Sequence, residues 1–171
     1  KLSDMGIALR LYRIDKRQEM ESTGLPFSDD LKMEVYEPSI FRASPDKSEF
    51  MRRKLWFLIT LGNYKVIYIK KGGNIVHYSY LIPKNFRFPF MGKKDFQIGP
   101  CLTYPEYRNL GIYSKVLRLI PSLFGETGTI FWIYTSQKNT SSQRVIEKSG
   151  FEFVANMKIS SFLRILRPIE G

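Results

Sequence analysis

Apolar positions change from helical spacing to strand-like alternation along the chain, and these changes predict most of its elements. A helix start stands at Ser44-Pro45-Asp46, and apolar residues at 50, 55, 58, 59 and 61 then follow helical spacing. Gly62-Asn63 ends this pattern. Two β-rich runs follow at 64–70 and 74–82, and Lys71-Gly72-Gly73 joins them. The spacing therefore predicts a helix followed by a β-hairpin.

The second half of the chain continues with alternating strands and helices. We predict a loop at 83–94, a strand at 96–104, a helix at 109–124, a strand at 129–135, a helix at 139–149, and strands at 151–156 and 158–166. This order predicts an α/β fold of the α+β type with a mixed sheet, in a single domain over residues 1–171.

Residues 1–43 give weaker signals. Ile7, Leu9 and Leu11 alternate as in a strand, whereas Met5, Ala8, Leu9 and Tyr12 also fit a helix, so both remain open. A loop is expected at 22–30, followed by a short strand at 31–36 that ends before Pro38.

Charge raises the question of an anionic partner. The chain has 171 residues and a net charge of +11, which suits nucleic acid, a membrane surface or a phosphorylated small molecule. Basic residues are spread from Lys1 to Arg167 and form no run longer than three, which makes a dedicated nucleic-acid stripe a poor fit. A nucleic-acid-binding protein would also need stacking aromatics on an exposed sheet face, and we predict that most aromatics are core.

Cysteine and histidine counts exclude several kinds of site. Cys101 and His77 are the single residues of their types, so no intrachain disulfide forms and a Cys- or His-based metal cluster is not expected. The longest apolar run, 55–61, contains Thr60 and is too short to span a bilayer. No signal peptide opens the chain, so we expect the reducing cytoplasm.

The turn after the predicted strand at 96–104 is the most informative segment. A helix is expected to begin there, and free N–H groups with the helix dipole make a helix N-terminus an anion site. Gly111 would allow close backbone approach, Arg108 adds positive charge and Ser114 a hydroxyl. An ordinary strand–turn–helix with a capping glycine would show the same residues.

Two motifs together resemble the GNAT acetyltransferase superfamily. Arg108-Asn109-Leu110-Gly111-Ile112-Tyr113 is similar to its motif A, Arg/Gln-x-x-Gly-x-Gly/Ala. The segment from Asn139 to Phe151, with its Glu-Lys-x-Gly-Phe close, is similar to its motif B. The resemblance covers about residues 44 to 167, and the pair is more specific than either motif alone.

The resemblance implies an acetyl-CoA N-acyltransferase-like fold, in which a mixed, mostly antiparallel, splayed central sheet is flanked by helices. Acetyl-CoA would enter the V between the fourth and fifth strands and acetylate an acceptor amine. The implied cofactor-binding residues are Leu102, Thr103, Arg108, Asn109, Leu110, Gly111, Ile112, Tyr113, Ser114 and Asn139.

Two positions depart from the family pattern. Tyr113 stands where a second small residue is usual, and its ring could point away from the cofactor. Ile146 stands where many members place the tyrosine that protonates the leaving thiolate. A family member that binds coenzyme A without catalysis is therefore an alternative.

Proton transfer needs other candidates. His77 has the only side chain with an ordinary pKa near 6.5, so it is a candidate base or acceptor ligand, or else a half-buried histidine bonded to backbone. Candidate acids are Ser142, Tyr113 and Tyr134, and water could also protonate the thiolate. Cys101 could carry an acyl group, but no second histidine activates it, and a core role is favoured.

The acceptor is the least determined part of the prediction. The loop from Pro83 to Asp95 carries three Phe and four basic residues, which could bind a nucleotide-linked amino sugar. The favoured alternative is that the Phe fill the core and the basic side chains stay solvated. The Gly-Ile-Tyr form of motif A is also similar to members that we associate with envelope polysaccharide synthesis. A homodimer through C-terminal edge strands is left open.

Overall fold

The structure is a computed structural model that describes residues 8–16, 27, 30–39, 50–160 and 164–169. Its elements in chain order are β1 (Ala8–Asp15), β2 (Leu31–Tyr36), α1 (Phe50–Thr60), β3 (Lys65–Lys71), β4 (Asn74–Pro83), β5 (Phe96–Thr103), the 3-10 turn η1 (Pro105–Tyr107), α2 (Ile112–Leu123), β6 (Ile130–Ser136), α3 (Thr140–Lys148), β7 (Glu152–Ile159) and β8 (Leu166–Pro168). Among these residues, no helix is both long and apolar enough to cross a membrane.

Most of the expected elements are confirmed, one open alternative is decided and one expected boundary is wrong. Residues 8–15 form a strand and not a helix, with Leu9 and Leu11 buried and the strand paired on both edges. The expected split at Met157 is wrong. Met157 is 1% exposed and continues the pairing of β7 with β1, so one strand spans this region and β8 begins only at Leu166. The predicted helix start at 44–46 lies outside the described residues.

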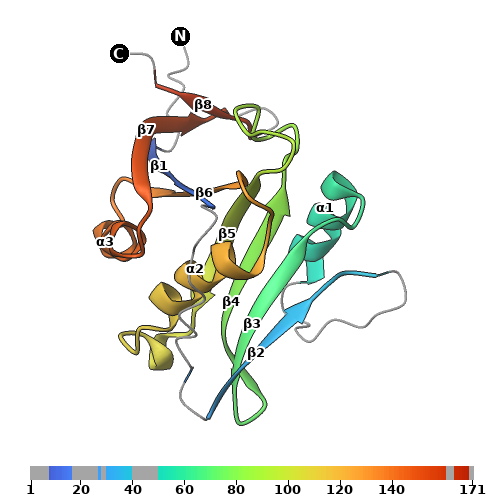
Figure 1. The fold of residues 1–171 in the computed structure, drawn as a ribbon, viewed down its shortest axis with the longest axis vertical. Coiled ribbons are helices and arrows are strands. Elements are labelled where there is room, and N and C mark those ends of the chain that lie inside the picture. Colours follow the sequence, from blue (N-terminus) through green and yellow to red (C-terminus); the bar gives the residue numbers. More distant parts are fainter. Residues whose placement is uncertain (1–7, 17–26, 28–29, 40–49, 161–163, 170–171) are drawn as a thin grey trace.

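The eight strands of the described residues form one sheet with the order β2-β3-β4-β5-β6-β1-β7-β8. Figure 1 shows β2 to β5 as one wing and β6, β1, β7 and β8 as the other. Every pairing is antiparallel except that of β5 with β6. This mixed, mostly antiparallel sheet with three helices confirms the expected fold class; a single domain over residues 1–171 stays a prediction.

The two wings meet over a short stretch. β5 and β6 pair only from Phe96 to Ile98 on one strand and from Phe131 to Ile133 on the other. On its opposite edge, β5 stays paired with β4 as far as Thr103, which faces His77. The sheet therefore splays beyond Ile98, and one edge of β5 is released from the β5–β6 ladder.

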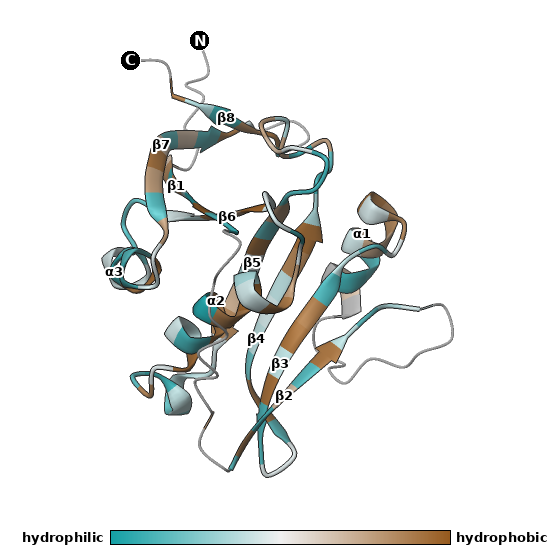
Figure 2. Ribbon diagram, in the orientation of Figure 1, coloured by the Kyte–Doolittle hydropathy of each residue, from teal (hydrophilic) through white to brown (hydrophobic). Residues whose placement is uncertain are grey.

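Two hydrophobic clusters cover opposite faces of the sheet. Along β3, Val66 and Tyr68 belong to the cluster that includes Trp56 of α1, whereas Ile67 and Ile69 belong to the cluster that includes α2. The central strands β3 and β4 are accordingly rich in apolar residues (Figure 2). Most of the strand tyrosines are buried, as expected, namely Tyr12, Tyr36, Tyr68, Tyr78 and Tyr80, whereas Tyr134 is partly buried and Phe153 is exposed.

Candidate functional site

The splay between β5 and β6 contains a cleft with two adjoining cavities. The first has a volume of about 600 Å³, and the second about 300 Å³. Residues that line the first are Cys101, Leu102, Thr103, Tyr107, Arg108, Asn109, Gly111, Ile112, Tyr113, Ser114, Asn139, Ser141, Ser142 and Val145. Four of these residues, Cys101, Tyr113, Asn139 and Ser142, line both cavities. The cleft thus reaches from the α2 N-terminus to the junction of the two wings.

The turn before α2 presents backbone groups to the first cavity. Gly111 is the N-cap of α2 with φ 72° and offers no side-chain cap. The Lys115 N–H donates to the Gly111 carbonyl, so the preceding N–H groups have no partner within the helix. A Cβ at Gly111 would meet no atom within 4 Å, which leaves open space in front of these groups. Glycine at this position therefore permits the left-handed backbone conformation and also leaves room for an anion to approach the N–H groups.

Arg108 lies at the mouth of this cavity and braces the turn. Its Nε donates a hydrogen bond to the Thr103 carbonyl at 3.2 Å, which ties the turn to the end of β5. The side chain is exposed, so its positive charge remains available to an anionic ligand.

A chain of hydrogen-bonded side chains runs beneath the cleft from β5 to α3. His77 Nδ1 lies 2.7 Å from Thr103 Oγ1, and its Nε2 lies 2.8 Å from Ser79 Oγ. Ser79 is also hydrogen-bonded to the Cys101 thiol, which bonds in turn to Tyr113. Tyr113 completes the chain with a side-chain hydrogen bond to Ser142 on α3. This series of side-chain contacts connects β4, beneath the cleft, with β5 and α3 on its two sides.

Burial determines the protonation states of these hydrogen-bonded side chains. His77 is fully buried, and this burial lowers its pKa from 6.5 to about 3, so the ring is neutral. Burial also raises the pKa of Cys101 to about 12. It raises the pKa of Tyr113 well above its ordinary value, while the hydrogen bond from Ser142 opposes the shift. Cys101 is therefore a thiol, and Tyr113 keeps its proton near neutral pH.

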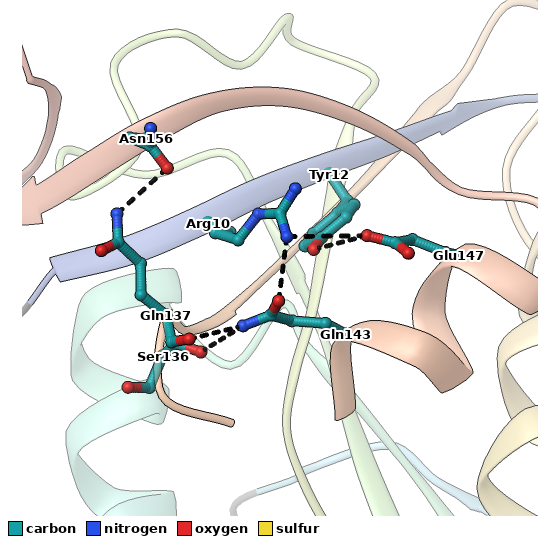
Figure 3. Close-up of polar contacts among 7 residues, drawn as sticks. All are labelled: Arg10, Tyr12, Ser136, Gln137, Gln143, Glu147 and Asn156. Carbon is teal, nitrogen blue, oxygen red and sulfur yellow. Dashed lines mark hydrogen bonds and ion pairs between the residues drawn. The ribbon is translucent and has the colours of Figure 1, made fainter. Parts of the chain in front are cut away.

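A polar cluster positions α3 against the cleft (Figure 3). Arg10 Nη1 donates to Gln143 Oε1 at 2.9 Å, and the Tyr12 hydroxyl donates to Glu147 at 3.0 Å. Gln143 Nε2 donates to the carbonyls of Ser136 and Gln137. These contacts join α3 to β1 and to the end of β6. They set the place of Asn139, the N-cap, whose Oδ1 accepts from the Ser142 N–H at 3.1 Å.

The structure brings most of the predicted cofactor residues together. Residues from the predicted set that line the first cavity are Leu102, Thr103, Arg108, Asn109, Gly111, Ile112, Tyr113, Ser114 and Asn139. Leu110 is the exception, because it is 59% exposed and is not among the lining residues.

The predicted proton-transfer residues separate into two groups. Tyr113 and Ser142 face the cleft, and the Tyr113 ring does not turn away from it. His77 lies beneath the cleft with its ring centroid 6.0 Å from that of Tyr113. Tyr134 lines the second cavity. Ile146 is fully buried in the core. The catalytic roles themselves stay predictions.

Sequence reasoning missed most of the second cavity. Its further lining residues are Leu9, Gln97, Ile98, Gly99, Pro100, Ile133, Thr135 and Ser136. These residues lie on three strands that are remote in sequence, and no local motif joins them. The buried polar residue Gln97, placed within an otherwise apolar strand start, is the signal that could have marked this site.

The loop at 83–94 fits neither interpretation fully. Phe88 is buried and Phe90 packs against the core, as expected of core residues, but Phe86 is 53% exposed. Arg87 is not solvated: its guanidinium lies 5.1 Å from the Trp56 ring centroid and donates from Nε to the Arg164 carbonyl. Within the described residues, no group of three or more His, Cys, Asp or Glu could hold a metal ion.

Comparisons with solved structures identify the fold. A protein assigned to the GNAT acetyltransferase family, from Novosphingobium aromaticivorans, matches with a TM-score of 0.55 and 13% identity over 88% of this chain and 61% of that chain. A GNAT-family acetyltransferase from Colwellia psychrerythraea matches with a TM-score of 0.56 and 14% identity over 86% and 53%. A conserved protein of unknown function from Staphylococcus epidermidis matches with a TM-score of 0.58 and 13% identity over 86% and 58%.

These likenesses concern the fold, because every identity is low. The chain spans about three fifths or less of the length of these solved chains. No family model matches the sequence, and no curated protein does. The comparisons show a GNAT-like fold, as the two motifs predicted.

Proposed function

We propose that the chain is an acetyl-CoA-dependent N-acetyltransferase that acts on a small amine. One observation carries the proposal: the released edge of β5 and the uncapped N-terminus of α2 face the same cavity. A strand edge can pair with an extended amide-containing arm, and a helix N-terminus can hold phosphate. Coenzyme A carries both groups, which also gives the net charge of +11 an anionic partner.

Each part of the cavity would hold a different part of acetyl-CoA. Leu102 and Thr103 offer backbone groups to the pantetheine arm. The N–H groups of 112–114 would bind the pyrophosphate, with Arg108 adding charge at the mouth. The Ser114 hydroxyl already contacts the Ser149 hydroxyl at 3.1 Å, so we assign its backbone N–H, and not its side chain, to the ligand.

Transfer requires one new bond and two proton movements. The acceptor nitrogen forms a bond to the thioester carbonyl carbon, the carbon–sulfur bond breaks, the nitrogen loses a proton and the sulfur gains one. We assign the Tyr113 hydroxyl to the leaving sulfur, with Ser142 hydrogen-bonded to it. Because the tyrosine pKa exceeds that of a thiol, Tyr113 stabilises the thiolate mainly by donating a hydrogen bond, and water completes its protonation.

His77 stays a predicted base, but its surroundings favour another role. A neutral ring with a pKa of about 3 binds a proton poorly, and both of its nitrogens are occupied by Thr103 and Ser79. We propose that His77 holds the floor of the cleft and that water removes the amine proton.

For the acceptor we propose an amino sugar, free or nucleotide-linked, as used in envelope polysaccharide synthesis. Support comes from exposed groups on the 83–94 loop, namely Phe86 and three lysines, Lys84, Lys93 and Lys94. A homodimer also stays a proposal; β8 is an edge strand of the sheet and could serve it. We expect the cytoplasm as the compartment, since the single cysteine is free.

Thermal unfolding with acetyl-CoA, coenzyme A and ATP tests the proposal. A ligand at 100 times its Kd stabilises by about 2.7 kcal/mol, which raises Tm by several degrees in a chain of this size. We expect a rise with acetyl-CoA and coenzyme A and little change with ATP. No rise with either coenzyme A species would overturn the proposal.

A second candidate is a coenzyme-A-binding protein without catalysis. Ile146 favours it, because the position of the family's tyrosine is filled by a buried apolar residue. Acetyl-CoA binding without acetylation of any amine would support this candidate. Nucleic-acid binding has less support, since most of the strand tyrosines are buried. Steeply salt-dependent binding to RNA or DNA of any sequence would favour it.

A further inference from the structure

Helix α1 presents large apolar side chains to solvent along one side. Met51, Leu55 and Leu58 stand four and three residues apart, which places them on one face of the helix. Leu61 follows three residues later, just after the helix ends. The exposed fractions are 75% for Met51, 50% for Leu55, 74% for Leu58 and 89% for Leu61. We call these four residues the outer stripe of α1.

The opposite side of α1 packs on the core. Trp56 is 4% exposed, and Phe57 and Ile59 pack against the same cluster on the sheet. Arg87 adds to this contact, because its guanidinium lies over the Trp56 ring. α1 is therefore apolar on two sides, and the sheet covers only one of them. A helix that is apolar all round is normally covered all round, so the outer stripe calls for a partner.

Leu61 has a backbone conformation that disfavours leucine. Its φ is 53°, and the Gly62 N–H donates to the Phe57 carbonyl at 3.0 Å, so Leu61 takes the helix-ending position at which glycine is usual. A Cβ in this left-handed conformation costs free energy, and a side chain this exposed recovers little of it by packing. A leucine at this position therefore contributes to the surface and not to the fold.

The charge in this part of the chain is of one sign. From residue 50 to residue 94 the sequence has ten Lys and Arg and no Asp or Glu, so this segment carries most of the net charge of +11. Lys54 follows Met51 by three residues and is exposed at the border of the outer stripe. Four of the ten form ion pairs with carboxylates elsewhere in the chain, namely Lys65, Lys70, Lys71 and Lys94. An apolar stripe in a basic segment matches an anionic bilayer, which offers acyl chains beneath negative headgroups.

The outer stripe lies apart from the cleft. None of the described residues of α1 lines either cavity, and α1 and α2 belong to clusters on opposite faces of the sheet. Figure 1 shows α1 beside the wing of β2 to β5, away from α2 and α3. Binding through α1 therefore leaves the cavity linings untouched.

We propose that α1 docks on an anionic lipid bilayer, lying in the plane of its surface with the outer stripe among the acyl chains and Lys54 at the headgroups. The occupant is a bilayer with anionic lipid and not a second protein chain. The helix has 11 residues and a length of about 16 Å, which is too short to span a bilayer. The docking does not depend on the proposed acetyl transfer and can be measured without any substrate.

Co-sedimentation with vesicles tests the proposal. One preparation contains equal parts of phosphatidylglycerol and phosphatidylcholine, and the other contains phosphatidylcholine alone. The variant Leu58→Gln replaces one apolar side chain of the outer stripe. Leu123→Gln is the matched control, because Leu123 is also exposed, ends α2 and lies outside both cavities. Tm values verify that each variant folds.

We expect the wild-type protein to bind the anionic vesicles and to bind phosphatidylcholine about tenfold more weakly or less. Leu58→Gln should lower binding to the anionic vesicles about tenfold, because the membrane no longer buries a leucine side chain at this position. Leu123→Gln should change nothing. Added salt should weaken the binding of wild type and of Leu58→Gln by the same factor, since both keep the same charge.

A second pair of variants measures insertion. Leu58→Trp and Leu123→Trp each add one indole, and the two native tryptophans, Trp56 and Trp132, give the same background in both. Lipids that carry bromine on their acyl chains quench an indole that lies among them. We expect stronger quenching in Leu58→Trp than in Leu123→Trp, because only position 58 belongs to the outer stripe.

Several outcomes would overturn the proposal. These are no binding of the wild type to anionic vesicles, equal binding to both kinds of vesicle, equal effects of Leu58→Gln and Leu123→Gln, and equal quenching of the two tryptophan variants. Analytical ultracentrifugation without vesicles covers the other occupant. If the wild type ignores vesicles but dimerises, and Leu58→Gln alone abolishes the dimer, the outer stripe is an interface between two copies and the membrane proposal is wrong.

Discussion

The two cavities of the cleft are built in opposite ways. The first takes most of its lining from two continuous segments, 101–114 and 139–145, and presents backbone N–H groups and one exposed arginine. The second is lined by Leu9, by residues 97–101 of β5 and by the end of β6, and its polar side chains carry no charge. Backbone contacts at a turn are largely independent of side-chain identity and suit a constant co-substrate. Side-chain contacts on several strands can be altered by single substitutions. We therefore expect co-substrate binding and acceptor choice to respond to different substitutions.

Tyr113→Phe tests the wall that both cavities share and should have the largest effect. Loss of the hydroxyl should lower kcat about 100-fold, a typical loss when one hydrogen-bond donor to a developing negative charge is removed. The KM for acetyl-CoA should stay unchanged, because the ring remains. Tyr107→Phe is the matched control, since Tyr107 lines the first cavity alone. Steady-state kinetics with both variants would contradict the assignment if the two lost equal activity.

Gly111→Val acts on the first cavity alone. A β-branched residue at φ 72° is strained and places methyl groups in front of the free N–H groups. The Kd of acetyl-CoA should rise about tenfold or more. Gly128→Val controls for strain, because Gly128 has φ 84°, also has open space around its Cβ and lies outside the cleft. Calorimetric titration should separate the two variants, although both lose stability.

His77 lies beneath the wall that both cavities share, and its contribution to the free energy of unfolding should depend on pH. The unfolded chain takes up a proton at its ordinary pKa of 6.5, but the folded chain does so only at about 3. The stabilisation by a neutral His77 is therefore complete above pH 6.5 and is lost as the pH falls toward 3, by about 1.4 kcal/mol per pH unit.

Urea unfolding of wild type and His77→Leu at several pH values measures this slope. The difference between the two curves isolates the histidine from the other titrating groups. We expect the wild-type free energy of unfolding to fall more steeply than that of His77→Leu between pH 6 and pH 4. Parallel curves would mean that the ring titrates normally in the folded protein.

Arg108→Gln should have the smallest effect and should again be confined to the first cavity. The arginine is exposed, so its charge should contribute no more than about 1 kcal/mol, or about fivefold in the Kd of acetyl-CoA. Its effect should shrink at high salt. Arg118→Gln removes the same charge from an exposed site on α2 outside the cavities. Titrations at two salt concentrations distinguish a local contact from a general loss of charge.

The same contrast explains how much of the molecule could be predicted from its sequence. The hairpin of β3 and β4, the turn at Gly111 and the N-cap at Asn139 are local, and each depends on residues within about one turn of itself. Leu110 was misplaced because a motif specifies its neighbours but not which way one exposed side chain points. The single strand β7 was missed because its continuity depends on β1, which is remote in sequence.

The type of a residue alone was a poor predictor of its role in the site, as His77 shows. His77 was singled out for its ordinary pKa, which assumes access to water. Pairing with β5 places it between two strands of the sheet, and burial then lowers its pKa. Gln97 was not singled out, because the burial of its side chain arises only in the folded sheet. Burial is a property of the whole sheet, so neither result follows from a local pattern.

The position of β1 has a consequence for how the protein is made. During synthesis β1 leaves the ribosome well before its two partners, β6 and β7, which lie beyond residue 129. Both edges of β1 therefore stay unpaired until residues 130–159 have been synthesised. Contacts between segments this distant in sequence slow folding and expose strand edges to aggregation. The second wing, and with it the wall of the second cavity that contains Leu9, is therefore completed late, long after the β3–β4 hairpin can form.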